Sequence, residues 1–178
     1  MLKKIVIIGP ESTGKSTLCE LLAKHYHTLW CPEYAREYLL TNGKEYRYDD
    51  LLTIAQGQLA LEDNYELKAK EQKQNALFID TDMYVMKVWC EYVFGKCHQF
   101  VLDEIVNREY DLYLFCNIDL PWVADELREY PDEGPRRELY QTYKDILSNQ
   151  QIPWVEINGN YEERLDTAIK AANRLLLL

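Results

Sequence analysis

The stretch Lys4-Ile5-Val6-Ile7-Ile8-Gly9-Pro10-Glu11-Ser12-Thr13-Gly14-Lys15-Ser16-Thr17 decides the fold of this chain. Its first part, residues 4–8, is apolar and rich in β-branched side chains, which predicts a buried strand. Beyond the stretch, leucines at 18, 21 and 22 recur at helical spacing and predict a helix over residues 15–26. Residues 9–17 therefore form a glycine-bounded loop between a strand and the start of a helix.

The loop carries the pattern Gly-x-x-x-x-Gly-Lys-Ser, which in this strand–loop–helix context indicates a phosphate-binding P-loop. A helix start presents unpaired N–H groups and the positive end of its dipole, and the loop backbone forms a concave nest for an anion. We expect Lys15 to reach the β- and γ-phosphates and the Ser16 hydroxyl to bind Mg²⁺. The residues expected to hold the phosphates of ATP are Gly9, Glu11, Ser12, Thr13, Gly14, Lys15, Ser16 and Thr17.

Composition limits the classes of protein that remain. The 178 residues are 47% hydrophobic and 28% charged, which predicts one globular domain over residues 1–178. The net charge of −10 argues against a nucleic-acid partner and favours a cationic second substrate. No window approaches about 18 uninterrupted apolar residues, so we expect no membrane span. Lys3-Lys4 is followed by the P-loop and not by a cleavage site, so we expect no secretory signal. The five cysteines form an odd set in apolar contexts, which indicates reduced thiols in a cytoplasmic protein.

Apolar runs and helical patterns alternate along the whole chain. Further strands are expected at 28–31, 76–80, 112–116 and 153–157. The helices expected between and after them lie at 33–42, from 48 to beyond 62, at 82–95, 100–107 and 137–147, and in a last segment that reaches 176. Continuous apolar strands alternating with helices predict an α/β protein, a three-layer α/β/α sandwich with a parallel five-stranded sheet.

Ligands bind such sheets at the carboxyl ends of the strands. This rule collects the loop at 9–17 with residues 33–37, 80–82, 117–122 and 158–161 at one edge. Phosphoryl transfer needs a phosphate cradle, a metal, a group that orients the attacking oxygen and cations near the transferred group. Each of these roles has a candidate at the edge.

Acidic side chains supply the candidates for metal binding and for the base. Asp80 ends a predicted strand, where it can bind Mg²⁺ or contact the acceptor hydroxyl, and Asp82 follows it. Either carboxylate can instead cap the next helix, and Asp82 is the better placed of the two. Glu33 can orient or deprotonate a substrate hydroxyl, or it can be a first-turn acid favoured by the helix dipole.

Arginines supply candidates for contacts with the phosphates. Arg36 lies one turn beyond Glu33 and can hold a phosphate or a carboxylate, or form a surface ion pair. Residues 125–137 are charged, contain Pro131, Gly134 and Pro135, and are expected to form a lid that closes over the phosphates and excludes water. The alternative is an ordinary solvated loop. The lid would carry Arg128, Arg136 and Arg137.

Aromatic side chains are frequent near the same edge. A cationic ring held between them gains up to about 2 kcal/mol once it is desolvated. Most aromatic residues at helical spacing nevertheless belong to a core, so each of these is open to both interpretations. The candidates are Trp30, Tyr34, Tyr84, Trp89, Tyr92 and Trp122.

Several motifs occur in an order that resembles a known family. They are Gly-Pro-Glu-Ser-Thr-Gly-Lys-Ser at 9–16, Glu-Tyr-Ala-Arg-Glu at 33–37, Phe-Ile-Asp-Thr-Asp at 78–82, Tyr-Val-Phe-Gly-Lys at 92–96 and Asp-Leu-Tyr-Leu at 111–114. With the segment 122–128 they resemble the ribosylnicotinamide kinase domain of the NadR family over nearly the whole chain. That domain has the fold of P-loop nucleoside and nucleotide kinases.

The resemblance implies a function and a set of site residues. It implies transfer of the γ-phosphate of ATP to the 5′-hydroxyl of nicotinamide riboside, which gives nicotinamide mononucleotide in NAD salvage. It places Gly14–Thr17 at ATP and Mg²⁺, Asp80 and Asp82 at the metal and the ribose, Arg128 in the lid, and Asn158 to Tyr161 beside the adenine. Tyr34, Arg36 and Trp89 are then expected to contact the acceptor. Adenylyl transfer and repressor activity, which other regions of NadR proteins carry, are not expected.

Two rival functions stay open at this point. One is a P-loop kinase for another nucleoside or small alcohol, and the other is a regulatory ATPase or nucleotide switch. A GTPase is disfavoured because Asn117-Ile118-Asp119 lacks the lysine of a guanine-binding motif. The choice of base among Glu33, Asp80 and Asp82 is also open, as are the oligomeric state and the role of the four leucines at 175–178.

Overall fold

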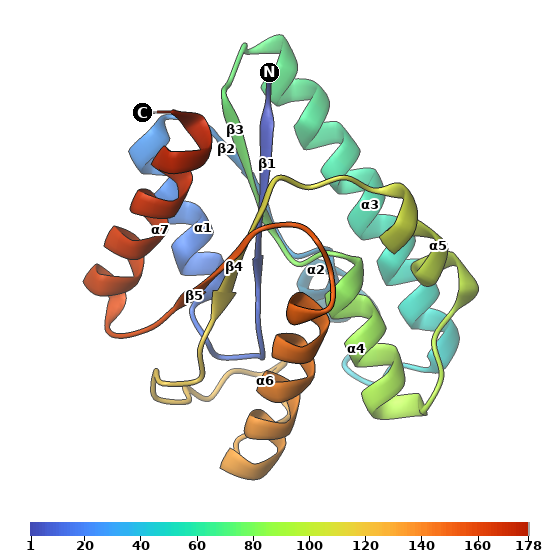
Figure 1. Cartoon of the computed structure of the whole chain (residues 1–178). Coiled ribbons are helices and arrows are strands. Elements are labelled where there is room, and N and C mark those ends of the chain that lie inside the picture. The colour runs from blue at the N-terminus through green and yellow to red at the C-terminus, as the bar shows by residue number, and fades with distance from the viewer. Residues whose placement is uncertain (178) are drawn as a thin grey trace.

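Five parallel strands form one sheet in the order β2-β3-β1-β4-β5 in the computed structural model, which describes residues 1–177 (Figure 1). Helices cover both faces of the sheet, so the predicted three-layer α/β/α sandwich is confirmed. The strands are β1 (Lys3–Ile8), β2 (Leu29–Cys31), β3 (Ala76–Asp80), β4 (Leu112–Cys116) and β5 (Trp154–Ile157).

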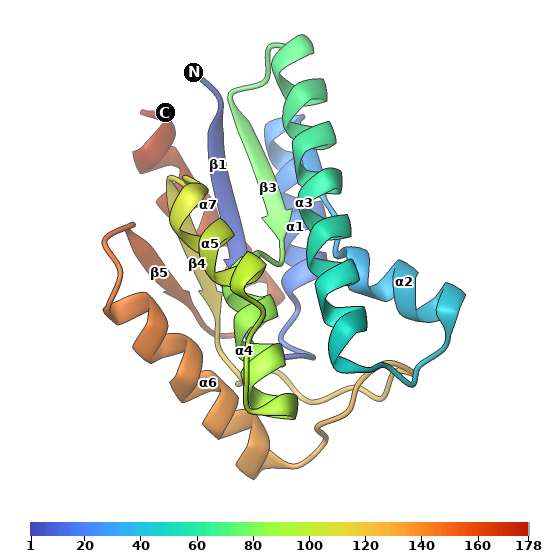
Figure 2. The ribbon, with the colours of Figure 1, turned by 90° about the vertical axis from the view of Figure 1, so that its right-hand side faces the viewer.

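The two outer layers are unequal. Helices α1 and α7 cover one face, and α3, α4 and α6 cover the other, with α5 packed beside α4 (Figures 1 and 2). Helix α2 lies beyond the carboxyl end of β2 and packs on α3. The helices are α1 (Lys15–Tyr26), α2 (Tyr34–Asn42), α3 (Tyr48–Glu71), α4 (Met83–Phe94), α5 (Gln99–Asn107), α6 (Glu133–Ser148) and α7 (Tyr161–Leu176).

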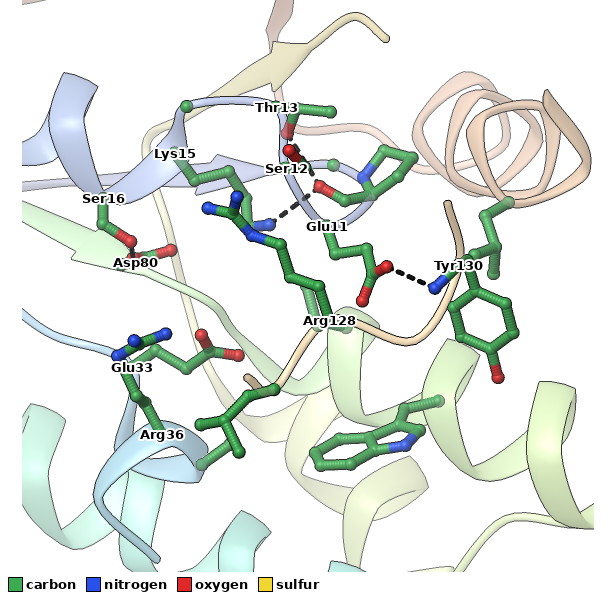
Figure 3. Close-up of a pocket in the computed structure, with 18 of the residues that line it drawn as sticks. Glu11, Ser12, Thr13, Lys15, Ser16, Glu33, Arg36, Asp80, Arg128 and Tyr130 are labelled. Carbon is green, nitrogen blue, oxygen red and sulfur yellow. Dashed lines mark hydrogen bonds between the residues drawn. The ribbon is translucent and has the colours of Figure 1, made fainter. Parts of the chain in front are cut away.

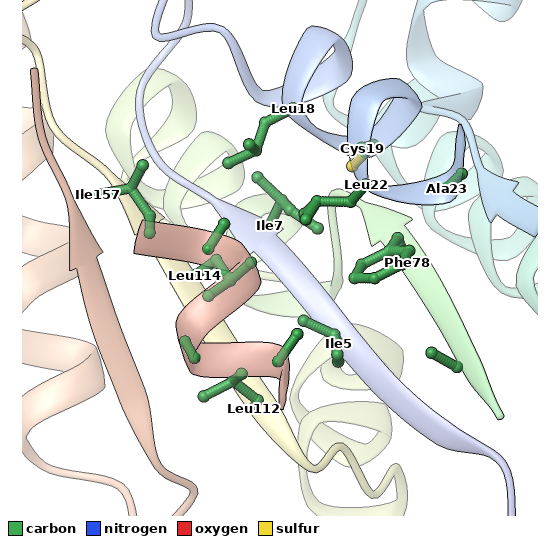
Figure 4. Close-up of a cluster of buried hydrophobic side chains, with 14 of the residues drawn as sticks. Ile5, Ile7, Leu18, Cys19, Leu22, Ala23, Phe78, Leu112, Leu114 and Ile157 are labelled. Atoms are coloured by element: carbon green, nitrogen blue, oxygen red, sulfur yellow. The ribbon is translucent and has the colours of Figure 1, made fainter. Parts of the chain in front are cut away.

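The central strand β1 is buried on both faces. Ile5 and Ile7 join the cluster under α1 and α7, which Figure 4 shows with Leu18 and Leu22 of α1. Val6 and Ile8 point to the other face, toward side chains of α4 and α6. An alternating strand would leave one face polar, and the uninterrupted apolar run of β1 follows from this two-sided burial.

Helix α6 begins earlier than the sequence predicted. It starts at Glu133 and not near Arg137, so the last five residues of the segment 125–137, which was expected to form a lid, belong to a helix. Pro135 lies in the first turn of α6, where a missing N–H costs no helical hydrogen bond. Prolines and charged residues are common both in loops and in the first turn of a helix. The pattern therefore predicted a loop where the structure has the start of α6.

Three smaller expectations can be compared with the structure. All five cysteines are free thiols, and each except Cys97 is buried. Leu175 and Leu176 pack against the core while Leu177 is exposed, and Leu178 lies outside the described residues. Within residues 1–177, no helix combines the length and the apolar character that crossing a membrane requires.

Candidate active site

The loop after β1 has a shape that only glycine permits at two positions. Gly9 and Gly14 have φ angles of +146° and +77°. A Cβ atom at Gly9 would lie 2.7 Å from the carbonyl oxygen of Cys116 at the end of β4. Because the loop turns this tightly against the sheet, it forms a cradle at the start of α1 that fits a nucleotide polyphosphate.

Hydrogen bonds within the protein hold the polar side chains of the loop. Lys15 Nζ and Thr13 Oγ1 both donate to the Pro10 carbonyl oxygen, at 2.9 and 2.7 Å. Ser16 Oγ donates to Asp80 Oδ2 at 2.5 Å. The loop, Lys15 and Ser16 are thus held together at the carboxyl ends of β1 and β3.

Ser16 and Asp80 suit a hard cation. Both offer oxygen atoms, the donor type that Mg²⁺ prefers, and Mg²⁺ commonly completes its shell with substrate phosphates and water. Burial raises the pKa of Asp80, while the charge of Lys15 and the hydrogen bond from Ser16 lower it. Across residues 1–177 there is no cluster of three His, Cys, Asp or Glu side chains that could hold a metal.

A cavity of about 350 Å³ opens beside the loop. Its walls come from the loop itself, the turn between β2 and α2, one side of α4, and the segment before α6 (Figure 3). Figure 3 shows Lys15, Glu33 and Arg128 projecting into the same space, near Asp80. The structure therefore brings together the four residues predicted to act in catalysis.

Glu33 lies in the turn between β2 and α2 and lines the cavity. Burial and, to a smaller extent, the negative charge of Asp80 raise the pKa of Glu33 to about 7, although Lys15 and Arg36 oppose the shift. A carboxylate with a pKa near neutrality can accept a proton from a substrate hydroxyl at physiological pH. Of the two roles considered for Glu33, this environment favours that of a base.

The turn that carries Glu33 is held by a residue that the sequence analysis missed. Gln58 of α3 is buried, accepts a hydrogen bond from Tyr34 N at 2.7 Å, and donates to the Pro32 carbonyl at 3.4 Å. It occupies the apolar side of α3 between Ile54 and Leu59. The only sequence signal was one polar residue at a core position of that helix.

The aromatic candidates divide into two groups. Trp30, Trp89 and Tyr92 line the cavity, and so do Tyr130 and Tyr143, which the sequence analysis did not select. The lining does not include Tyr34, Tyr84 or Trp122.

Two predicted substrate contacts lie behind the cavity wall. The Tyr34 ring packs on Gly57 of α3, where a Cβ atom would lie 2.0 Å from the ring. Asp82 is buried, caps α4 by accepting from Tyr84 N at 3.0 Å, and accepts from Tyr113 Oη at 2.8 Å. Burial raises its pKa to about 6. For Asp82 the geometry supports the capping role and not the contact with ribose.

Only one of the three arginines considered for the lid lines the cavity. Arg128 does so, while Arg136 is buried in α6 and points to the Leu120 carbonyl at 3.4 Å. Arg137 is exposed and pairs with Glu133 at 2.5 Å. Arg36 pairs with Asp125 at 2.9 Å, as its ion-pair alternative expects, and it also lines the cavity.

The two residues expected beside the adenine lie outside this cavity. Tyr161 begins α7, is half exposed, and its ring edge lies 3.4 Å from the position of a Cβ at Gly14. Asn158 is exposed and accepts from Asn117 Nδ2 at 2.7 Å. Buried Arg164, another residue missed from the sequence, donates to the Thr13 carbonyl at 2.9 Å and so joins α7 to the loop.

A parallel sheet with a glycine-bounded loop after its central strand and a carboxylate at the end of the neighbouring strand defines a P-loop nucleotide-binding domain. The family model described as an AAA domain matches residues 4–164, and the chain belongs to that family.

Curated relatives agree with the resemblance inferred from the motifs. The trifunctional NAD biosynthesis/regulator protein NadR of Escherichia coli (strain K12) is 29% identical over 98% of this chain, and its counterpart from Salmonella typhimurium is 28% identical. The chain spans 43% of the length of each relative. The predicted resemblance to NadR is thereby confirmed.

Solved structures show the same fold. A NadR protein in complex with NR superposes with a TM-score of 0.82 at 23% identity, over 99% of this chain and 51% of the other. A thymidylate kinase from Ehrlichia chaffeensis gives 0.68 at 14% identity, over 96% and 98%. The expected fold of P-loop nucleoside and nucleotide kinases is confirmed.

Proposed function

We propose that this chain transfers the γ-phosphate of ATP to the 5′-hydroxyl of nicotinamide riboside and so forms nicotinamide mononucleotide. The observation that carries the proposal is the cavity, which places Glu33 and aromatic walls directly beside the phosphate loop. The NR complex of a NadR protein and the NadR relatives support the choice of acceptor.

The acceptor side has the chemistry that a pyridinium riboside needs. Glu33 and Glu129 make this wall acidic, and Trp30 and Trp89 offer aromatic faces. A cationic ring is attracted to such faces and to the negative charge. The net charge of −10 acts in the same direction.

Residues of this chain carry out the transfer as follows. Glu33 accepts the proton of the 5′-hydroxyl, whose oxygen bonds to the γ-phosphorus while the bond from that phosphorus to the β–γ bridging oxygen breaks, so that ADP leaves. Lys15 and Arg128 neutralise the charge on the phosphoryl oxygens. Ser16 and Asp80 would hold Mg²⁺, which supplies further positive charge at the β- and γ-phosphates when bound.

ADP release measured across a panel of nucleosides, with nicotinamide riboside included, tests the proposal. We expect release that depends on nicotinamide riboside, with one nicotinamide mononucleotide formed per ADP. A stronger response to another nucleoside would show a kinase with a different acceptor. Slow release that no nucleoside or small alcohol changes would show a regulatory ATPase or nucleotide switch and would contradict the proposal.

A further inference from the structure

The segment between β4 and α6 is fastened to the phosphate loop by one carboxylate. Glu11 Oε2 accepts from the backbone N of Glu129 at 3.0 Å. Glu11 Oε1 accepts from the backbone N of Tyr130 at 2.6 Å, the bond that Figure 3 draws. Val123 N adds a bond to Ser12 Oγ at 3.0 Å. Each oxygen of Glu11 is therefore engaged by a different amide of the same segment, residues 123–130, which we call the lid.

The opposite side of the lid is fastened to the acceptor wall. Both terminal nitrogens of Arg36 donate to Asp125, at 3.1 and 2.9 Å. Tyr46 Oη donates to Glu129 Oε2 at 3.0 Å and accepts from Trp89 Nε1 at 2.8 Å. The lid thus bridges the phosphate loop and an aromatic residue of the cavity.

Arg128 lies between these attachment points. Its neighbours Leu127, Glu129 and Tyr130 line the cavity with it, and its side chain extends toward Lys15 (Figure 3). Its guanidinium also donates to the Val123 carbonyl within the lid. The position of the guanidinium therefore depends on where the lid backbone is held.

The strengths of the attachments differ. The Arg36 side chain is 49% exposed, and an exposed ion pair contributes about 0–1 kcal/mol. Hydrogen bonds from backbone amides to an ionised carboxylate are about twice as strong as neutral ones. A carboxylate beside a phosphate site also repels the polyphosphate, so its presence in the loop calls for a role other than holding the nucleotide.

We propose that Glu11 is a positioning residue that fastens the lid to the phosphate loop and so places Arg128 at the phosphoryl group. The proposal rests on the proposed phosphoryl transfer for the role of Arg128, but the fastening itself does not depend on it. It concerns the side chain of Glu11 and leaves the backbone of this residue in the expected phosphate cradle.

Hydrogen exchange of the ligand-free protein tests the fastening directly. Glu11→Gln keeps the shape but turns an NH₂ group toward one of the two lid amides, which loses its acceptor. We expect the amides of Glu129 and Tyr130 to exchange at least about tenfold faster, with β1 and β3 unchanged. The matched variant Glu20→Gln, at an exposed position of α1, should exchange like the wild type. Unchanged exchange in the lid of Glu11→Gln would overturn the proposal.

A double-mutant cycle tests whether Glu11 acts through Arg128. Glu11→Gln should lower kcat for transfer by about tenfold and raise the fraction of ATP lost to water, whereas in the Arg128→Ala background the same change should have less than about a twofold effect. Equal losses in both backgrounds would overturn the positioning role. If no acceptor supports transfer, the proposed function fails while the exchange experiment still decides whether Glu11 holds the lid.

Discussion

The Ser16 hydroxyl donates to Asp80 Oδ2 at 2.5 Å and so joins the first turn of α1 to the carboxyl end of β3. The two residues are 64 positions apart in the sequence. They meet because β1 and β3 are parallel neighbours in a register that pairs Ile7 with Asp80, which brings the loop after β1 to the end of β3. The register of the central strands therefore sets the candidate metal site.

Asp80→Asn should separate function from stability. We expect transfer to fall by about 10²–10³-fold, because the variant loses the anionic oxygen facing Ser16. We expect the melting temperature at pH 7 to rise. The reason is that burial raises the pKa of Asp80, so the ionised side chain opposes folding.

Kinetics across a Mg²⁺ titration and thermal unfolding measure both effects. Asp103→Asn, at an exposed position of α5, serves as the matched control and should leave both unchanged. An Asp80→Asn variant that melts lower than the wild type would contradict the stability argument.

Lys15→Ala should abolish phosphoryl transfer while the fold stays intact. Lys15 Nζ donates to the Pro10 carbonyl at 2.9 Å, and the residue is partly exposed, so its loss opens no core cavity. Loss of a cation aligned with the phosphates is expected to reduce kcat by at least about 10²-fold. Circular dichroism and a transfer assay measure the two outcomes, and Lys24→Ala on the exposed side of α1 provides the control. Activity equal to that of the wild type in Lys15→Ala would refute the proposed role.

Glu33 predicts a pH dependence with a definite sign. Its pKa of about 7 lies above the ordinary value of 4.5, so the base form is scarce at pH 6 and predominant at pH 8. If Glu33 is the base, kcat/KM rises with pH and levels off above about 7, whereas Glu33→Gln is slower by about 10²–10⁴-fold and lacks this rise. A rise that persists unchanged in the variant would assign the titration to another group.

The raised pKa of Glu33 makes the stability of the protein fall with rising pH, whereas activity rises. Because folding raises the pKa of Glu33, the contribution of this group to stability is complete below about 4.5 and is lost as the pH rises through about 7. Glu33→Gln should therefore gain stability relative to the wild type between pH 5 and pH 8. Thermal unfolding at both pH values measures this difference, and an equal difference at both would contradict it.

Local patterns predicted the sheet, the phosphate loop and Asp80 because each depends on residues close together in the chain. Such patterns could not predict which of Tyr34, Trp89 and Asp82 line the cavity and which pack behind it. Helical spacing shows that aromatic residues share a face, but not which element covers that face. The Tyr34 ring packs on α3 because Gly57 has no side chain to block it. These two residues are 23 positions apart in the sequence.

Buried polar residues were also not predictable from the sequence. Glu62 of α3 is an acidic residue, yet it is fully buried and accepts from Tyr110 Oη at 2.9 Å and from Lys4 Nζ at 3.4 Å. Its partners lie in β1 and in the segment before β4, far away in the sequence, so no local pattern identifies them. A polar residue on an apolar helix face becomes interpretable only when its distant partners are known.

Gln58 offers the last prediction, because it connects this kind of burial to catalysis. Gln58→Leu leaves Tyr34 N and the Pro32 carbonyl without their side-chain partner in a buried turn, and each unsatisfied buried group costs about 1–3 kcal/mol. The turn also carries Glu33, so kcat should fall by about tenfold or more as the base shifts. The KM for ATP should stay near that of the wild type, because the hydrogen bonds of Gln58 in the described residues go to residues 31, 32 and 34 and to the Asp80 carbonyl, and none goes to the phosphate loop.

The matched variant is Gln56→Leu, the same substitution at an exposed position of α3. It should leave both the melting temperature and kcat within error of the wild type. Equal losses of stability in the two variants would show that the substitution acts through α3 itself. A destabilised Gln58→Leu with unchanged kcat would show that Glu33 keeps its place without this tether, and would remove the link between the buried amide and the base.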